Sequence, residues 1–66
     1  MMLESVILAV ITTTPEKFAG GAPLFVCEST EELEFVANNL EAILDGIAHR
    51  LQENVYIIVK HYQRVL

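Results

Sequence analysis

The sequence predicts a small α+β domain of β-β-α-β order, in which one three-stranded mixed sheet is covered on one face by a single long helix. Runs of β-branched residues stand near both ends of the chain, and a helix-capping motif opens an amphipathic stretch between them. The 66 residues are 53% apolar, which excludes a disordered chain and leaves room for one domain, residues 1–66.

Two predicted strands precede the helix. Residues 3–13 are rich in valine, isoleucine and threonine, whose stiff side chains suit a pleated strand. Residues 14–23 contain both prolines and two of the three glycines, so they predict a loop. Residues 24–28 form a second, short apolar run. We expect these two strands to lie antiparallel if the loop makes a hairpin.

The helix is the clearest element. Ser29 and Glu32 have the spacing of a capping box, in which each side chain satisfies a backbone N–H of the first turn. Apolar residues then recur at three- and four-residue steps, which predicts a helix over residues 30–52. The predicted stripe comprises Leu33, Val36, Ala37, Leu40, Ile43, Leu44, Ile47, Ala48 and Leu51. Residues 55–65 predict the last strand, parallel to the second strand if the two are neighbours.

The first and last predicted strands are apolar on both of their faces, whereas one helix covers only one face of a sheet. The uncovered set is either Ile7, Ile11, Tyr56 and Ile58 or the residues that alternate with them. Such a patch marks an interface, so we predict self-association through the sheet, most simply as a dimer. Two alternatives stay open: the first strand curls and buries both faces, or another protein covers the patch.

The far side of the helix and the loop add weaker candidates. Ala42 and Gly46 are small residues four apart, a spacing that lets another backbone approach, although Gly46 could simply bend the helix. Phe35 shares that side, and Phe18 lies at the tip of the loop. The predicted interaction residues are therefore Ile7, Ile11, Phe18, Phe35, Ala42, Gly46, Tyr56 and Ile58.

The charge balance indicates which class of partner the chain can bind. Nine acidic residues against four basic ones give a net charge of −5, which disfavours nucleic acid. An acidic edge at the helix start offers a docking surface for a basic protein, although capping and the helix dipole also explain it as a solvated edge. This edge comprises Glu28, Glu31, Glu32 and Glu34.

The sequence indicates neither catalysis nor a bound cofactor or metal. Cys27, His49 and His61 are 22 and 12 residues apart, without the close pairs of zinc sites. Residues 17–23 lack the spacing of a phosphate loop. The apolar run over residues 6–11 is far shorter than the roughly 20 residues of a membrane span and has no basic residue before it. A single cysteine fits a reducing compartment, so we predict a cytoplasmic protein without membrane partners.

These observations favour a non-catalytic protein–protein interaction module, a homo-oligomeric small acidic adaptor or inhibitor. A first alternative is a small-ligand sensor with a pocket between subunits near Gly20 and Gly21. A second alternative is a minimal oligomeric enzyme with an active site shared across subunits. Its candidate residues would be Tyr56, His49, His61 and Glu28.

Overall fold

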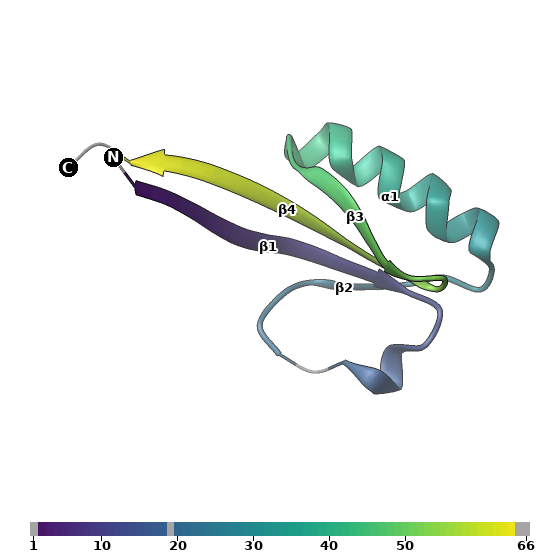
Figure 1. The fold of residues 1–66 in the computed structure, drawn as a ribbon. Coiled ribbons are helices and arrows are strands. Elements are labelled where there is room, and N and C mark those ends of the chain that lie inside the picture. The colour runs from purple at the N-terminus through teal and green to yellow at the C-terminus, as the bar shows by residue number, and fades with distance from the viewer. Residues whose placement is uncertain (1, 19, 65–66) are drawn as a thin grey trace.

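A computed structural model describes residues 2–18 and 20–64 and shows one helix packed on a mixed four-stranded sheet (Figure 1). The elements in chain order are β1 (Met2–Thr12), the short 3-10 helix η1 (Pro15–Lys17), β2 (Leu24–Val26), α1 (Thr30–Leu44), β3 (Ile47–Gln52) and β4 (Val55–Arg64). The strands lie in the order β2-β1-β4-β3. The predicted α+β class, a helix on a mixed sheet, is confirmed, but the predicted number of three strands is wrong.

The fourth strand comes from the region predicted as the end of the helix. α1 stops at Leu44 because Asp45 adopts the left-handed conformation, with φ 54°, and its N–H donates to the Glu41 carbonyl. The chain then turns at Gly46 and runs back as β3, which pairs antiparallel with β4. Residues 47–52 are therefore strand rather than helix, and α1 has 15 residues.

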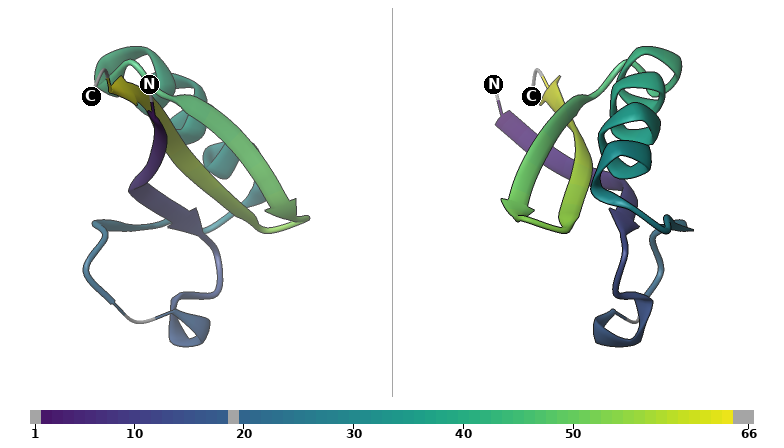
Figure 2. Two further views of the ribbon diagram at one scale, coloured as in Figure 1. Left: turned by 60° about the vertical axis from the view of Figure 1, so that its left-hand side comes forward. Right: turned by 90° about the vertical axis from the view of Figure 1, so that its right-hand side faces the viewer.

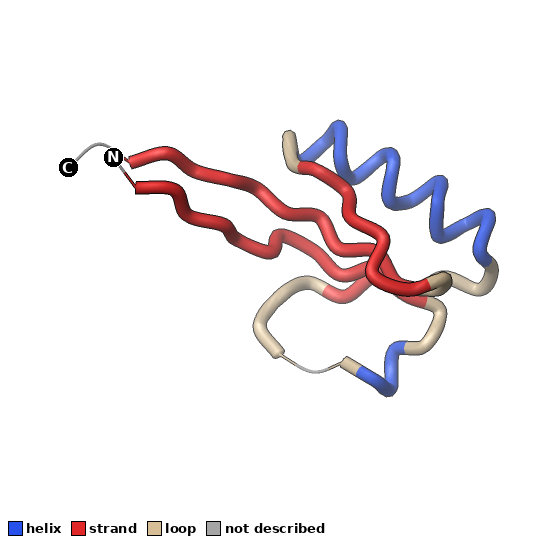
Figure 3. Tube along the Cα trace, viewed as in Figure 1, coloured by secondary structure: helices blue, strands red, loops and turns tan. Residues whose placement is uncertain are grey.

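The predicted strand connections are also wrong. β2 pairs with β1 in parallel, through only three residue pairs, because the described residues between the two strands, 13–18 and 20–23, follow a wide loop instead of a hairpin (Figure 3). β4 lies between β1 and β3 and is antiparallel to both. The second and last strands are thus separated by β1 and run in opposite directions, and α1 links β2 to β3 at the two edges of the sheet.

The core lies between α1 and one face of the sheet. Its fully buried members come from four segments and are Ala9, Ile11, Cys27, Leu33, Ala37 and Ile58. Burying a side chain as large as leucine or isoleucine contributes about 1.5–3 kcal/mol. At the C-terminal end of β1, the Thr12 hydroxyl donates to the Asn54 carbonyl at 3.1 Å and accepts from the Thr14 N–H at 3.0 Å. These bonds tie the end of β1 to the β3–β4 turn.

One extra residue in β1 changes which side chains share a face. Ile7 pairs with Val59 and Ala9 with Ile58, so Leu8 is bulged out of the ladder. Side chains alternate between faces in a regular strand, and the bulge shifts that alternation by one residue. Ile7 therefore lies on the face opposite Ala9 and Ile11, although the sequence pattern alone places all three together.

The ends of β1 and β4 project beyond the rest of the molecule as a two-stranded arm. We define the arm as residues 2–6 paired with residues 60–64. Figure 1 shows it extending past α1 and β3, and Figure 2 shows the β1–β2 loop extending away from the helix. The molecule is accordingly elongated, with extents of 43 × 23 × 17 Å.

Candidate protein interface

The sheet face opposite α1, which we call the open face, carries apolar side chains on all four strands. Ala9 and Ile58 pack on α1, so the residues that alternate with them point to the other side. The open face comprises Ile7, Val10, Leu24, Val26, Ile47, Ile57 and Val59, of which Val59 is buried by its neighbours and Val10 and Ile57 are half-buried. Ile7 and Ile47 are each 50% exposed and Val26 is 55% exposed. An exposed apolar surface of this kind is typical of a protein interface.

Acidic groups are concentrated on the other side of the molecule. Residues 28–45, which include α1 and its two caps, hold six of the nine acidic residues and no lysine or arginine. The polar side chains that we place on the open face are hydroxyls, amides or histidines. Ser5 and His61 form one such pair, with 2.8 Å between Oγ and Nδ1, and His49 lies on β3. Among the described side chains, the open face therefore contains no carboxylate.

The structure separates the four sheet residues of the predicted interaction set. Ile7 is exposed on the open face. Ile11 and Ile58 are fully buried under α1, so their predicted place in an exposed patch is wrong. Tyr56 is half-buried on the same covered face, and the Arg50 guanidinium lies 5.6 Å from its ring centre. The helix thus covers Ile11, Tyr56 and Ile58 of this set and leaves Ile7 exposed.

The helix-side candidates are also separated. Phe35, which is 68% exposed, and Ala42 lie at the surface of α1. Gly46 lies outside the helix, so the predicted pair of small residues on one helix face does not form. A Cβ at Gly46 would stand 2.7 Å from Ile58 Cγ2 and 3.0 Å from the Val59 carbonyl oxygen. Gly46 is therefore explained by close packing of the α1–β3 connection on β4.

The predicted N-cap at Ser29 is confirmed, but the Glu32 carboxylate accepts from the residue before the N-cap rather than from the first turn. The Glu32 N–H donates to Ser29 Oγ at 3.1 Å, and Glu32 Oε2 accepts from the Glu28 N–H at 3.4 Å. Glu34 pairs with Arg50 of β3 at 3.6 Å. All four glutamates of the predicted acidic edge are exposed, so this edge remains at the surface, although two of its carboxylates also hold local structure.

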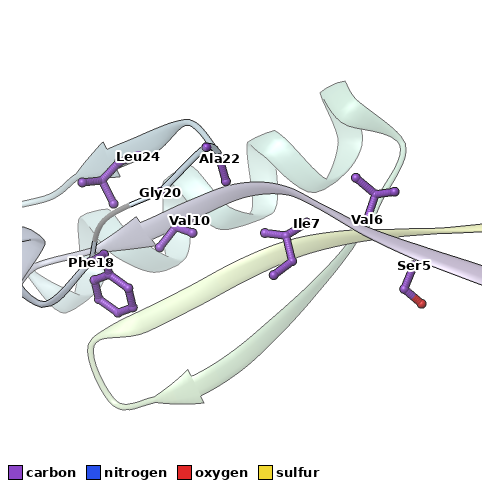
Figure 4. A pocket seen from close by; sticks show the side chains of 9 residues that line it. Ser5, Val6, Ile7, Val10, Phe18, Gly20, Ala22 and Leu24 are labelled. Carbon is purple, nitrogen blue, oxygen red and sulfur yellow. The ribbon is translucent and has the colours of Figure 1, made fainter.

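A groove lies between β1 and the segment that precedes β2 (Figure 4). Its volume is about 660 Å³, and it opens beside the outer edge of β1. The lining residues are Ser5, Val6, Ile7, Val10, Phe18, Gly20, Gly21, Ala22 and Leu24, none of which is charged. The predicted contact residue Phe18 thus lines the same groove as Ile7 and Val10.

The residue types that carry chemistry are dispersed. Cys27 is buried beneath α1, where desolvation, and secondarily the Glu32 carboxylate, raises the pKa of its thiol. His49 and His61 are exposed on different strands. Within residues 2–18 and 20–64, no three histidine, cysteine or carboxylate side chains gather to hold a metal ion. None of the helices in this part of the chain is long and apolar enough to cross a bilayer.

Comparison with known proteins places this surface in context. The sequence model of a family described as "Capping complex subunit for YIEGIA" matches residues 4–61. The "Uncharacterized protein YpzH" of Bacillus subtilis (strain 168) is 60% identical over 60 residues, which cover 91% of this chain and 94% of that protein. No solved structure matches the chain.

Proposed function

This chain belongs to the family of capping complex subunits for YIEGIA, and from that premise we propose that it is a non-catalytic subunit that assembles through the open face. The family description names a protein complex, and the open face offers this chain a surface for joining one. We further propose that two copies pair through their open faces, and that the resulting dimer presents its acidic helices to other members of the complex.

The open face is the observation that carries this proposal. Specific interfaces bury roughly 800 Å² on each partner, and the two longer extents of this molecule are 43 and 23 Å. The molecule is therefore large enough for one of its faces to supply an interface of that size. Ile7, Val26 and Ile47 retain half or more of their exposure in the isolated chain, so association would remove apolar area from water at about 25 cal/mol per Å².

Charge favours a second copy on this face. A net charge of −5 on each chain opposes association if the acidic sides meet. Pairing through the open faces places the six acidic residues of residues 28–45 on the outside of both copies. A two-fold axis would then bring the same uncharged surface of each copy together, as a symmetric dimer requires.

The outward acidic edge supplies the adaptor role. Glu28, Glu31, Glu32 and Glu34 remain exposed at the start of α1, on the side away from the open face. An acidic surface of this kind selects basic partners and speeds their encounter. We propose that a basic surface of another subunit, such as the YIEGIA protein named in the family description, docks there.

Absolute mass by light scattering, measured over a dilution series, tests the dimer. We expect the unaltered chain to elute as a dimer and Ile47→Lys to elute as a monomer at the same concentrations. Ile43→Lys is the matched control, because Ile43 is 73% exposed but lies on α1. It should remain dimeric, and circular dichroism should show both variants folded. A monomeric unaltered chain, or a dimer broken by Ile43→Lys alone, would overturn the proposed interface.

A further inference from the structure

We propose that the groove beside β1 captures one extended segment of a partner protein, which adds a strand to the outer edge of β1. This inference rests on the proposed function in taking the partner to be a protein, and the groove borders the open face, with which it shares Ile7, Val10 and Leu24. The captured strand would extend the pairing along the outer edge of β1 that β2 begins. β2 pairs with Val10, Ile11 and Thr12, and the groove adjoins the next part of β1.

The outer edge of β1 lacks a neighbour along the groove. In the described part of the chain, the pairing between β1 and β2 ends at Val10, and the backbone hydrogen bonds to that edge end at the bond from the Val10 N–H to the Pro23 carbonyl. Residues 20–22 line the groove from the far side without pairing with β1. An unpaired strand edge is a template for another strand.

The register identifies which backbone groups point into the groove. The Val10 N–H and the Thr12 carbonyl each make a 2.9 Å bond to the chain on the β2 side. In an antiparallel ladder, successive residues direct these groups alternately inward and outward. Counting from Val10 along the β4 partners and allowing for the bulge at Leu8, the outward-facing residues are Ile7 and Ser5. Both of them line the groove, so a strand there would meet two N–H and two C=O groups.

The far wall suits a single strand. Gly20 and Gly21 have no side chain, and no atom lies within 4 Å of the position that a Cβ would take on either residue. Neighbouring strands lie about 4.8 Å apart, so a strand added to β1 would lie between β1 and these glycines. A second strand behind it, as at the edge of a sheet from another copy, would meet the wall formed by residues 20–22.

The chemistry of the occupant follows from the lining and the net charge. The described lining is uncharged and mostly apolar, with Phe18, Val6 and Leu24 among its larger side chains. The segment inside the groove should therefore be uncharged and β-branched. The whole chain carries a charge of −5, so basic residues flanking that segment would be attracted from a distance.

The probe is a fluorescent peptide of sequence Lys-Val-Thr-Val-Thr-Val-Lys, titrated by anisotropy onto the full chain. The control peptide has the same sequence with N-methyl groups on two adjacent central residues, which blocks hydrogen bonding on both edges of the strand. We expect the control to bind at least tenfold more weakly. We also expect the probe to slow hydrogen exchange of the Ser5 and Ile7 amides.

Two variants locate the binding site. Gly21→Trp fills the groove at a position where a side chain meets open space, and it should weaken probe binding at least tenfold. Asn38→Trp places the same side chain on an exposed position of α1 and should leave binding within twofold. Both variants should keep the mass of the unaltered chain, so a failure here is distinguishable from a failure of the proposed dimer.

Three results would overturn the inference. The first is no binding with the probe at millimolar concentration. The second is equal affinity for the probe and the N-methylated peptide, which would indicate an apolar ligand pocket rather than a strand acceptor. The third is unchanged affinity in Gly21→Trp.

Discussion

The two faces of the sheet are built from the same strands and have similar apolar character, yet only one of them is covered. On the face under α1, Ala9, Ile11 and Ile58 are fully buried against Leu33 and Ala37. On the open face, the comparable side chains of Ile7 and Ile47 keep half of their exposure. The difference shows that apolar patterning by itself does not define a core. The placement of α1 decides which face contributes to the stability of the isolated chain and which can contribute to assembly.

The largest contrast is expected between truncations on the two faces. Leu33→Ala should cost about 2–5 kcal/mol of unfolding free energy, because it leaves a cavity at a fully buried position. A chain of this size has roughly 3–10 kcal/mol of stability in total. Ile47→Ala should cost within about 1 kcal/mol in the monomer, since Ile47 is 50% exposed. Urea unfolding at dilutions where the chain is monomeric measures both. Equal losses would mean that the open face is buried within one chain.

A smaller contrast is expected between two glycines. Gly46→Ala should cost about 1–3 kcal/mol, because the added Cβ would overlap Ile58 at 2.7 Å on the covered side. Gly21→Ala should stay within about 1 kcal/mol of the unaltered chain and could be stabilising, because its Cβ meets open space. Thermal unfolding of the two variants checks this. If they behave alike, the α1–β3 connection does not pack tightly on β4.

The smallest effect concerns cysteine chemistry on the two faces. Burial raises the pKa of Cys27 above 9.0, so little thiolate is present at neutral pH and alkylation by iodoacetamide should be slow. A cysteine introduced as Ile47→Cys in a Cys27→Ser background should react quickly in the monomer. Mass spectrometry over time compares the two thiols. Rapid alkylation of native Cys27 would show that α1 does not seal the covered face.

The same pKa shift predicts a direction for stability against pH. The folded chain holds the Cys27 proton more tightly than the unfolded chain. The stabilisation that goes with the protonated thiol is therefore fully present below the unfolded pKa near 9.0. It is lost as the pH rises from there toward the higher folded pKa. The midpoint of unfolding should therefore fall above pH 9, and Cys27→Ala should reduce that fall. An identical pH profile in both chains would contradict the assignment.

Much of the architecture could be predicted from local chemistry. Ser29 and Glu32 identified the start of α1, and β-branched runs identified β1 and β4. The end of α1 was missed because Ile47, Ala48 and Leu51 continue the helical spacing of apolar residues. What stops the helix is the left-handed Asp45 and the contact of Gly46 with β4. The first is a backbone choice that many residues can make, and the second depends on a strand that comes later in the chain.

The residues of the open face could be predicted only in part for the same reason. The sequence predicted that one sheet face would be left open, but not which one, because that depends on where α1 lies. Ile47 was assigned to the helix stripe, so its place on the open face was missed. The parallel pairing of β2, which creates the groove, depends on how residues 13–23 return to β1. Glycines and prolines indicate that a loop exists without fixing its path.

The extra residue at Leu8 has a consequence for how this surface can change during evolution. Exchanges among isoleucine, valine and leucine would preserve the character of both faces, and so the sequence can drift at these positions. Removing Leu8 itself would restore regular alternation and keep Ile7 opposite Ala9, on the open face, whereas straightening the strand with Leu8 retained would turn Ile7 toward the helix side. We therefore expect relatives that share this surface either to keep the bulge or to lack the residue that forms it.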